Sequence, residues 1–209
     1  MPKRELAIAL SAAAVATAGD LLLLLVGNSQ RPELALPQPP AFALPLGGIL
    51  GVCAIPFYAL GYRAVARAIR PGSPVLARVV LVCGVAAAAV GALIHGLTAL
   101  AIGEAIRAGT AAAPPVEAVA ASGAVLVASW LAAAVFFLAA SAAIFASRAL
   151  PRSVAWVNPV AVTLVLVVMG LPTELGRSFL VPAAPNLAHV VFFFVCLRAL
   201  DRELRVRGD

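Results

Sequence analysis

Charged residues and histidines are scarce in this chain of 209 residues. Only 11% of the residues are charged and two are histidines, whereas 63% are hydrophobic and the mean hydropathy is +1.06. Ordinary soluble domains do not have this composition, so we expect an integral membrane protein. The apolar runs continue for about 20 residues without alternation, which favours a bundle of helices over a β-barrel.

Several signatures of known chemistry are also absent. The sequence contains no GxSxG, P-loop, GxGxxG or DDxxD pattern, which argues against a serine hydrolase, a nucleotide-driven pump and an aspartate-rich prenyltransferase. The only lysine is Lys3, so a retinal Schiff base within a helix is excluded. The three cysteines lack CxxC spacing, which argues against a disulfide framework or a zinc site. We expect all three to be small buried residues: Cys53, Cys83 and Cys196.

Six apolar segments are separated by turn and loop residues. The first connection, 28–42, contains four prolines and is predicted to be an extended surface loop. We therefore predict an all-α fold, a single domain over 1–209 built as a polytopic bundle of six transmembrane helices. The predicted helices are 5–27, 43–66, 75–102, 118–147, 157–173 and 185–200.

The basic residues predict the orientation of such a bundle. Twelve of the 15 Lys and Arg residues fall on the side of the two termini, and three fall on the other side: Arg31, Arg107 and Arg177. Short loops rich in Lys and Arg stay in the cytoplasm. We expect both termini in the cytoplasm and the protein in the inner (plasma) membrane. The net charge of +6 is thus interpreted as an orientation signal, and no nucleic-acid partner is expected.

Asp20 is the most informative polar residue, because it interrupts the first apolar segment without a basic neighbour. A carboxylate at a helix centre costs about 2.5 to 3.5 kcal/mol on insertion scales, unless it protonates, pairs or faces a wet cavity. With the predicted topology, Asp20 and His95 each lie about seven residues, or about 10 Å, from the outer ends of their helices. Two ionisable groups are therefore expected at one depth.

Two further candidates are predicted in the same leaflet. Glu174 falls at the outer end of the fifth segment, and His189 falls in the outer third of the sixth. We predict that Asp20, His95, Glu174 and His189 form a catalytic pocket, since two carboxyls and two imidazoles can transfer protons. The predicted substrate-binding residues are Asn186, Trp130 and Ser129.

Structural explanations compete with this hypothesis. An Asp20–His95 pair, or Glu174 with Arg177, would satisfy the charges without any chemistry. Two histidines and two carboxylates could also supply zinc or iron, and two histidines could hold haem, but no HxxxH or HxxE pair is present. The sequence requires no metal or other cofactor.

Tyr58 and Tyr62, four residues apart near the cytoplasmic end of the second segment, are interpreted as interfacial anchors. The pair Gly47 and Gly51 predicts a close helix contact.

Three stretches resemble an uncharacterised family of bacterial six-helix membrane proteins. They are GDLLLLLVG at 19–27, PFYALGY at 56–62 and GALIHG at 91–96. The resemblance covers about the first half of the chain and implies no reaction. It places Asp20 and His95 within the shared stretches.

These patterns favour an integral-membrane enzyme that uses acid/base chemistry in an outer-leaflet pocket. Its expected substrate is lipid-like or isoprenoid, and the reaction is a cyclisation, an isomerisation or a hydrolysis. The alternatives are a small-molecule or proton-coupled transporter, or a ligand-binding protein, with the same residues, and an accessory subunit in which they only join helices. The expected partners are membrane lipids, a hydrophobic small molecule and a second copy of the chain.

Overall fold

The chain folds almost entirely into helices. The computed structural model describes residues 2–29, 31–109, 116–147 and 150–208, with side chains described except at 116–123, 125–126, 129–130, 152–153 and 201–208. Helices make up 87% of the structure, and no strand occurs in the ranges described. The all-α class predicted from the composition is confirmed.

The main helices follow one another with short connections. In chain order they are α1 (Pro2–Asn28), α2 (Ala43–Ala54), α3 (Tyr58–Ile69), α4 (Pro74–Arg107), α5 (Val116–Ser147), α6 (Arg152–Trp156), α7 (Pro159–Gly170) and α8 (Val181–Gly208). Three shorter elements accompany them, the 3₁₀-helices η1 (Pro32–Leu34) and η2 (Ile55–Phe57) and the π-helix η3 (Gly176–Leu180).

Two helix starts show how local sequence sets these boundaries. The Ser73 hydroxyl accepts a hydrogen bond from the Leu76 amide at 3.3 Å, and a proline follows it at the first helical position of α4. Asn158 does the same for α7, accepting from the Ala161 amide at 3.0 Å before another proline. A polar N-cap followed by proline satisfies an orphan amide and presets the backbone, so the helix begins there.

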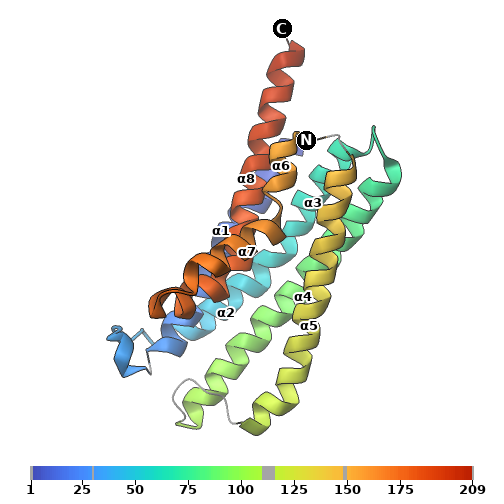
Figure 1. Ribbon diagram of the computed structural model, residues 1–209. Coiled ribbons are helices and arrows are strands. Elements are labelled where there is room, and N and C mark those ends of the chain that lie inside the picture. The colour runs from blue at the N-terminus through green and yellow to red at the C-terminus, as the bar shows by residue number, and fades with distance from the viewer. Residues whose placement is uncertain (1, 30, 110–115, 148–149, 209) are drawn as a thin grey trace.

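The helices run up and down the bundle in succession. α1 lies beside α2, α3 and α8, while α4 and α5 form the opposite flank, and α7 pairs with α8 (Figure 1). The start of α1 and the end of α8 lie toward the same end of the bundle, and α8 extends beyond the other helices.

In the described part of the chain, four helical stretches are long and apolar enough to cross a membrane. They are Pro2–Asn28, Ala43–Ile69, Pro74–Arg107 and Gly176–Leu200. Two more apolar stretches, Leu131–Ser147 and Pro159–Gly170, are shorter. Several apolar helices can therefore span a bilayer.

Two of the predicted segments differ from the structure. The second is not one regular helix, because η2, which contains Pro56, separates α2 from α3. The sixth begins at Gly176, not at Pro185, because the π-helix leads directly into α8 and Pro185 lies within that helix. This earlier start adds about 14 Å of helix before Pro185 at 1.5 Å per residue.

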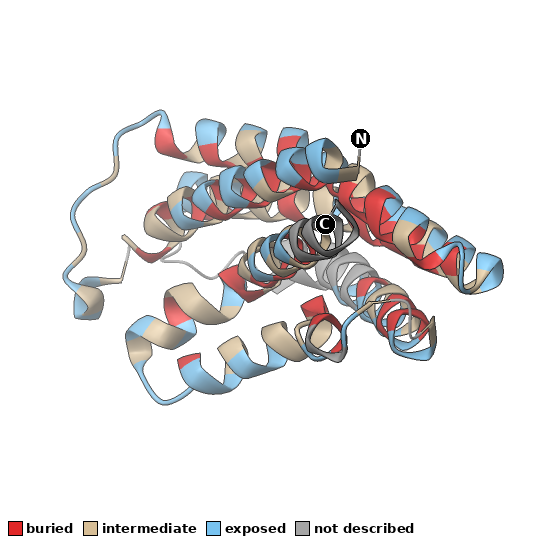
Figure 2. Cartoon of the chain, turned by 90° about the horizontal axis from the view of Figure 1, so that it is seen from above, coloured by how far each residue is buried: buried red, intermediate tan, exposed pale blue. Residues whose placement is uncertain are grey.

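The main core occupies the half of the bundle near the termini. It is built around large side chains of α1, α3 and α8 that are almost inaccessible: Leu6, Tyr58, Tyr62, Ile69, Phe192 and Phe193. Buried residues lie on the faces that the helices turn toward one another, and exposed residues lie on the outside (Figure 2).

The small residues have two outcomes. The close contact predicted from Gly47 and Gly51 is confirmed, since a Cβ at Gly47 would lie 2.9 Å from the Gly19 carbonyl oxygen of α1. The prediction of three buried cysteines is confirmed for Cys196 alone, since Cys83 is half-buried and Cys53 is exposed on α2. Small apolar side chains of such helices also face outward.

Candidate functional site

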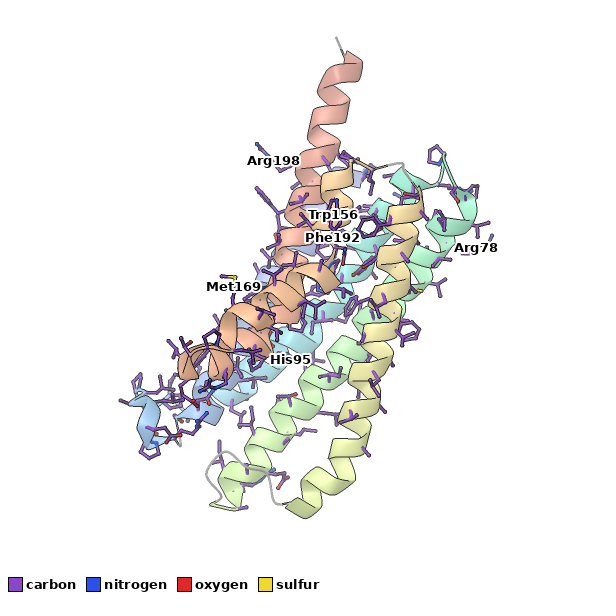
Figure 3. All side chains as sticks on the ribbon, viewed as in Figure 1. Arg78, His95, Trp156, Met169, Phe192 and Arg198 are labelled. Carbon is purple, nitrogen blue, oxygen red and sulfur yellow. The ribbon has the colours of Figure 1, made fainter. Side chains whose placement is uncertain are left out.

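Asp20 of α1 and His95 of α4 form a direct contact inside the bundle. The Asp20 Oδ1 and His95 Nδ1 atoms are 3.0 Å apart, and the two side chains are 14% and 4% exposed. Figure 3 labels His95 in the lower half of the bundle, on α4. The expected juxtaposition of these two ionisable residues is thus present.

The backbone of α2 holds the other side of the His95 ring. His95 Nε2 lies 3.0 Å from the Gly47 carbonyl oxygen. A Cβ at Gly51, one turn further on, would be 2.1 Å from the same nitrogen. Only glycine leaves space for the imidazole at this position, so Gly51 is part of the site although it contributes no side chain.

Asn186 and Tyr58 extend the network from the second carboxylate oxygen. Asn186 Nδ2 donates to Asp20 Oδ2 at 2.7 Å, and the Tyr58 hydroxyl donates to Asn186 Oδ1 at 2.8 Å. Both hydrogen bonds of Asn186 have a defined direction, because its NH₂ group donates to the Asp20 carboxylate and its oxygen accepts from the Tyr58 hydroxyl. The result is a connected network across α1, α2, α3, α4 and α8.

The hydrogen-bond partners determine how many protons the Asp20–His95 pair holds. A carbonyl oxygen only accepts, so the bond to Gly47 assigns a proton to His95 Nε2. A second proton must then lie between His95 Nδ1 and Asp20 Oδ1, either on the imidazole or on the carboxyl. The pair is neutral overall in both forms, and it contains one proton that can be transferred. A neutral pair also removes most of the cost expected for a lone buried carboxylate.

A small cavity lies directly against this pair. Its volume is about 130 Å³, and side chains of α1, α3, α4, α5 and α8 surround it. The polar groups on its wall include Asp20, His95, Asn186 and His189. The remaining wall is mostly aliphatic and aromatic. The transferable proton is therefore next to a largely apolar space.

His189 lines the same cavity but belongs to a separate hydrogen-bonded unit. Its Nδ1 is 2.7 Å from the Pro185 carbonyl oxygen and its Nε2 is 3.0 Å from the Tyr62 hydroxyl. The carbonyl assigns the proton to Nδ1, so the Tyr62 hydroxyl donates to Nε2. Tyr58 stacks on the His189 ring with centroids 4.6 Å apart. Contact between the two units is through this stacking.

The prediction that both tyrosines anchor the bundle at a membrane interface is wrong. Tyr58 is 2% exposed and Tyr62 is 1% exposed, and both hydroxyls bond within the bundle. Because the last helix begins at Gly176, His189 lies farther from its start than predicted, and the His189 ring contacts Tyr62. A sequence signal was present, since Gly47, Gly51, Tyr58 and Tyr62 are spaced four, seven and four residues apart, the spacing of one helix face.

Glu174 does not line this cavity. Its carboxylate accepts hydrogen bonds from Arg31 and Arg177, each at 2.5 Å, in the connection between α7 and α8. The Arg177 and Arg31 guanidiniums lower the pKa of Glu174, and hydrogen bonds to Glu33 and Glu174 raise the pKa of Arg31. Arg31 also donates to the Ser178 hydroxyl at 3.1 Å. We call this set the outer ion cluster: Arg31, Glu33, Glu174, Arg177 and Ser178.

Two predicted site residues are not placed by their side chains. Ser129 and Trp130 lie on α5, and their side chains are outside the described part of the structure. No group of three or more His, Cys, Asp and Glu side chains suited to a metal ion occurs among the residues described. Both ring nitrogens of each histidine have protein partners.

Fold and site together define an all-helical protein with several apolar helices long enough to cross a membrane and a buried Asp–His pair beside a small cavity. The chain belongs to the DUF6796 family, a family of unknown function, which matches residues 2–203. The match extends beyond the stretches on which the sequence resemblance rested. No curated protein and no solved structure matched the chain.

Proposed function

We propose that this protein is an integral-membrane enzyme that uses the Asp20–His95 pair for acid/base chemistry on a lipid-like or isoprenoid substrate. The reaction is a cyclisation, an isomerisation or a hydrolysis. In this proposal the substrate reaches the cavity from the bilayer, since the cavity wall is mostly apolar and the helices are lipid-compatible.

One observation carries the proposal. The Gly47 carbonyl requires a proton on His95 Nε2, so the contact between Nδ1 and Asp20 contains a second, transferable proton at the cavity wall. General acids need a proton positioned against the substrate in a site where water is scarce. The position of the pair on the wall of a mostly apolar cavity supports this role.

The neighbouring residues have supporting roles in the proposal. Asn186 orients the carboxyl group through Oδ2, and Tyr58 orients Asn186. His189 contributes to the cavity wall and is bonded to Tyr62. Glu174 belongs to the outer ion cluster and its side chain is 43% exposed. We therefore propose that it joins helix ends and takes no part in the reaction.

The test begins with purified protein and any lipid that co-purifies with it. That lipid, or a fraction of membrane lipids, is incubated with the wild type and with Asp20→Asn, and products are separated by mass spectrometry. Loss of the acid proton is expected to reduce turnover by about a hundredfold or more. Equal turnover by the two proteins would remove Asp20 from the acid role.

A transporter is the second candidate, because one helix is interrupted at the site and another contains a proline there. The α2–η2–α3 break lies next to Tyr58, and α8 contains Pro185 one turn before His189. Broken helices at a buried polar site are typical of secondary transporters. Proteoliposomes separate the two: proton-coupled uptake without chemical change of the solute would support transport, and product formation in detergent would support the enzyme.

We further propose six crossings of the inner (plasma) membrane, with both termini in the cytoplasm. Twelve of the 15 Lys and Arg residues fall on that side in the predicted topology. Reporter fusions at the C-terminus and in the loop at 29–42 test this. A cytoplasmic reporter should be active at the C-terminus and inactive in the loop, and the reverse pattern would overturn the orientation.

A further inference from the structure

Among the described residues, the cavity wall has no permanent positive charge. None of the described residues that line it is a lysine or an arginine. The acidic and imidazole side chains on the wall are Asp20, His95 and His189. A phosphate or a carboxylate inside it would therefore lack a cationic partner and would lie beside an acid, which is strongly unfavourable in an apolar site. We therefore expect the part of a substrate that enters the cavity to be uncharged.

The size of the cavity limits that part further. Its volume is about 130 Å³, close to the roughly 150 Å³ of an engineered apolar cavity that binds benzene. A group of about six carbon atoms therefore fits beside the Asp20–His95 pair. A whole lipid does not fit, so we expect only one end of a longer chain to enter the cavity.

Aromatic rings stand next to the transferable proton. Tyr58, Phe137 and His189 line the cavity, and the Phe137 and His189 rings have centroids 5.1 Å apart. The π electrons of aromatic rings stabilise cations, most strongly where water is excluded. A site that combines a proton donor with aromatic rings and apolar walls suits a substrate that becomes positively charged on protonation.

We infer that the cavity binds the uncharged, branched alkene end of an isoprenoid-type chain. This inference rests on the proposed acid/base function and names its substrate class. The Asp20–His95 proton adds to the less substituted alkene carbon, and the π electron pair forms the new C–H bond. The more substituted carbon becomes a cation beside Tyr58 and Phe137. The Asp20–His95 pair then removes a proton from a neighbouring carbon, and the electrons of that C–H bond form a shifted double bond.

This cycle consumes no co-reactant, because the proton that is donated is recovered. The net reaction is an isomerisation, and an internal alkene could intercept the same cation to close a ring. In deuterated water the pair carries deuterium, so each turnover labels the alkene. Label uptake therefore reports proton transfer directly.

The experiment uses three small probes with the five-carbon branched skeleton. They are 2-methyl-2-butene, its saturated analogue 2-methylbutane, and the charged 3-methylbutanoate. The full chain in nanodiscs is incubated with 2-methyl-2-butene in deuterated water, and mass spectrometry measures deuterium uptake and formation of 2-methyl-1-butene. We expect uptake at least about a hundredfold above that of Asp20→Asn.

Binding is measured separately by nitrogen NMR on histidine-labelled protein. The chain has only two histidines, so the His95 and His189 signals can be assigned by single substitutions. Both uncharged probes should shift the His95 signals in a saturable way, and 3-methylbutanoate should not.

A pair of variants on α5 tests the cavity. Ala133 is 4% exposed and lines the cavity, whereas the adjacent Ala134 faces outward. Ala133→Leu should fill the space and reduce both His95 shifts and label uptake by about tenfold or more. Ala134→Leu should leave both unchanged, with circular dichroism confirming that the two variants fold alike.

The outcomes separate the two proposals. Saturable binding of the uncharged probes without Asp20-dependent deuterium uptake would overturn the acid/base function. His95 shifts caused by 3-methylbutanoate and not by the uncharged probes would overturn the substrate class. So would label uptake that Ala133→Leu leaves unchanged.

Discussion

The two acids of the candidate list, Asp20 and Glu174, stabilise the bundle in different ways. Asp20 is 14% exposed and bonds to an imidazole and an amide, so its network holds no permanent cation. Glu174 is 43% exposed and bonds to two guanidiniums. Inside the apolar bundle the acid is matched by partners that can share a proton, and at its end by full charges that water can screen.

The two acids therefore suit different roles, Asp20 in proton transfer under the proposed function and Glu174 in holding helix ends together. The proton shared by Asp20 and His95 can lie on either group with the pair neutral overall, whereas an arginine holds its proton at every accessible pH. The outer ion cluster joins the loop after α1 to the connection before α8, and Asn28 adds a bond to the Ser178 carbonyl oxygen at 3.1 Å. The outer ion cluster therefore connects the end of α1 to the start of the last helix.

The largest expected effect comes from removing the proton-sharing partner. His95→Leu should reduce turnover about as much as Asp20→Asn, by about a hundredfold or more, because the two residues act as a unit. The double variant should be no worse than either single one. Arg31→Leu, the corresponding change in the outer ion cluster, should keep turnover within about twofold. Additive losses at Asp20 and His95 would show that they act independently.

The next effect comes from the glycine under His95. A methyl group at Gly51 would overlap the imidazole, so Gly51→Ala should displace His95 and destabilise the protein by about 1 to 3 kcal/mol. Gly103→Ala is the matched control, because its Cβ would lie 3.5 Å from Leu44 Cδ2, an ordinary contact. Thermal unfolding and the His95 NMR signals measure the difference. Equal behaviour of the two variants would show that Gly51 does not position His95.

The two tyrosines should separate function from stability. Tyr58→Phe leaves Asn186 Oδ1 without its donor, and Tyr62→Phe leaves His189 Nε2 without its donor. Each loss should cost about 1 to 3 kcal/mol of unfolding free energy. Only Tyr58→Phe should also lower turnover, since Tyr58 belongs to the Asp20 network. A larger loss of turnover in Tyr62→Phe would transfer the active role to His189.

The smallest effect is expected in the outer ion cluster. The pKa of Glu174 is lowered below its ordinary value by Arg177 and Arg31, so its stabilising contribution is present above about pH 4.5 and is lost as the pH falls through the lowered pKa. Glu174→Gln should therefore lower the melting temperature slightly at pH 7, and the difference should be smaller at pH 3. A constant difference between the variant and the wild type at both pH values would contradict this linkage.

Part of the site could be predicted because the sequence shows which ionisable residues are costly to bury in an apolar helix. Asp20 and His95 are expensive in an apolar helix, and counting residues along each helix placed them at one depth. Asn186 was found through its position beside His189. Three site components were not predicted from the sequence: Gly51, Tyr58 and the Gly47 carbonyl. A glycine, a backbone oxygen and a tyrosine carry no charge that is costly to bury in an apolar helix, so no such cost marks them in the sequence.

Composition alone determined that the protein is a bundle of apolar helices, because long continuous apolar runs can satisfy their backbone only as helices in lipid. It also singled out the acid that such a helix must neutralise. The tertiary structure decided which partner does so. The early start of the last helix at Gly176 and the break near Pro56 set which side chains of different helices lie at the same level. These shifts brought His189 to Tyr62 and left Glu174 with Arg31, because contacts between helices depend on where each helix begins and not on the spacing within it.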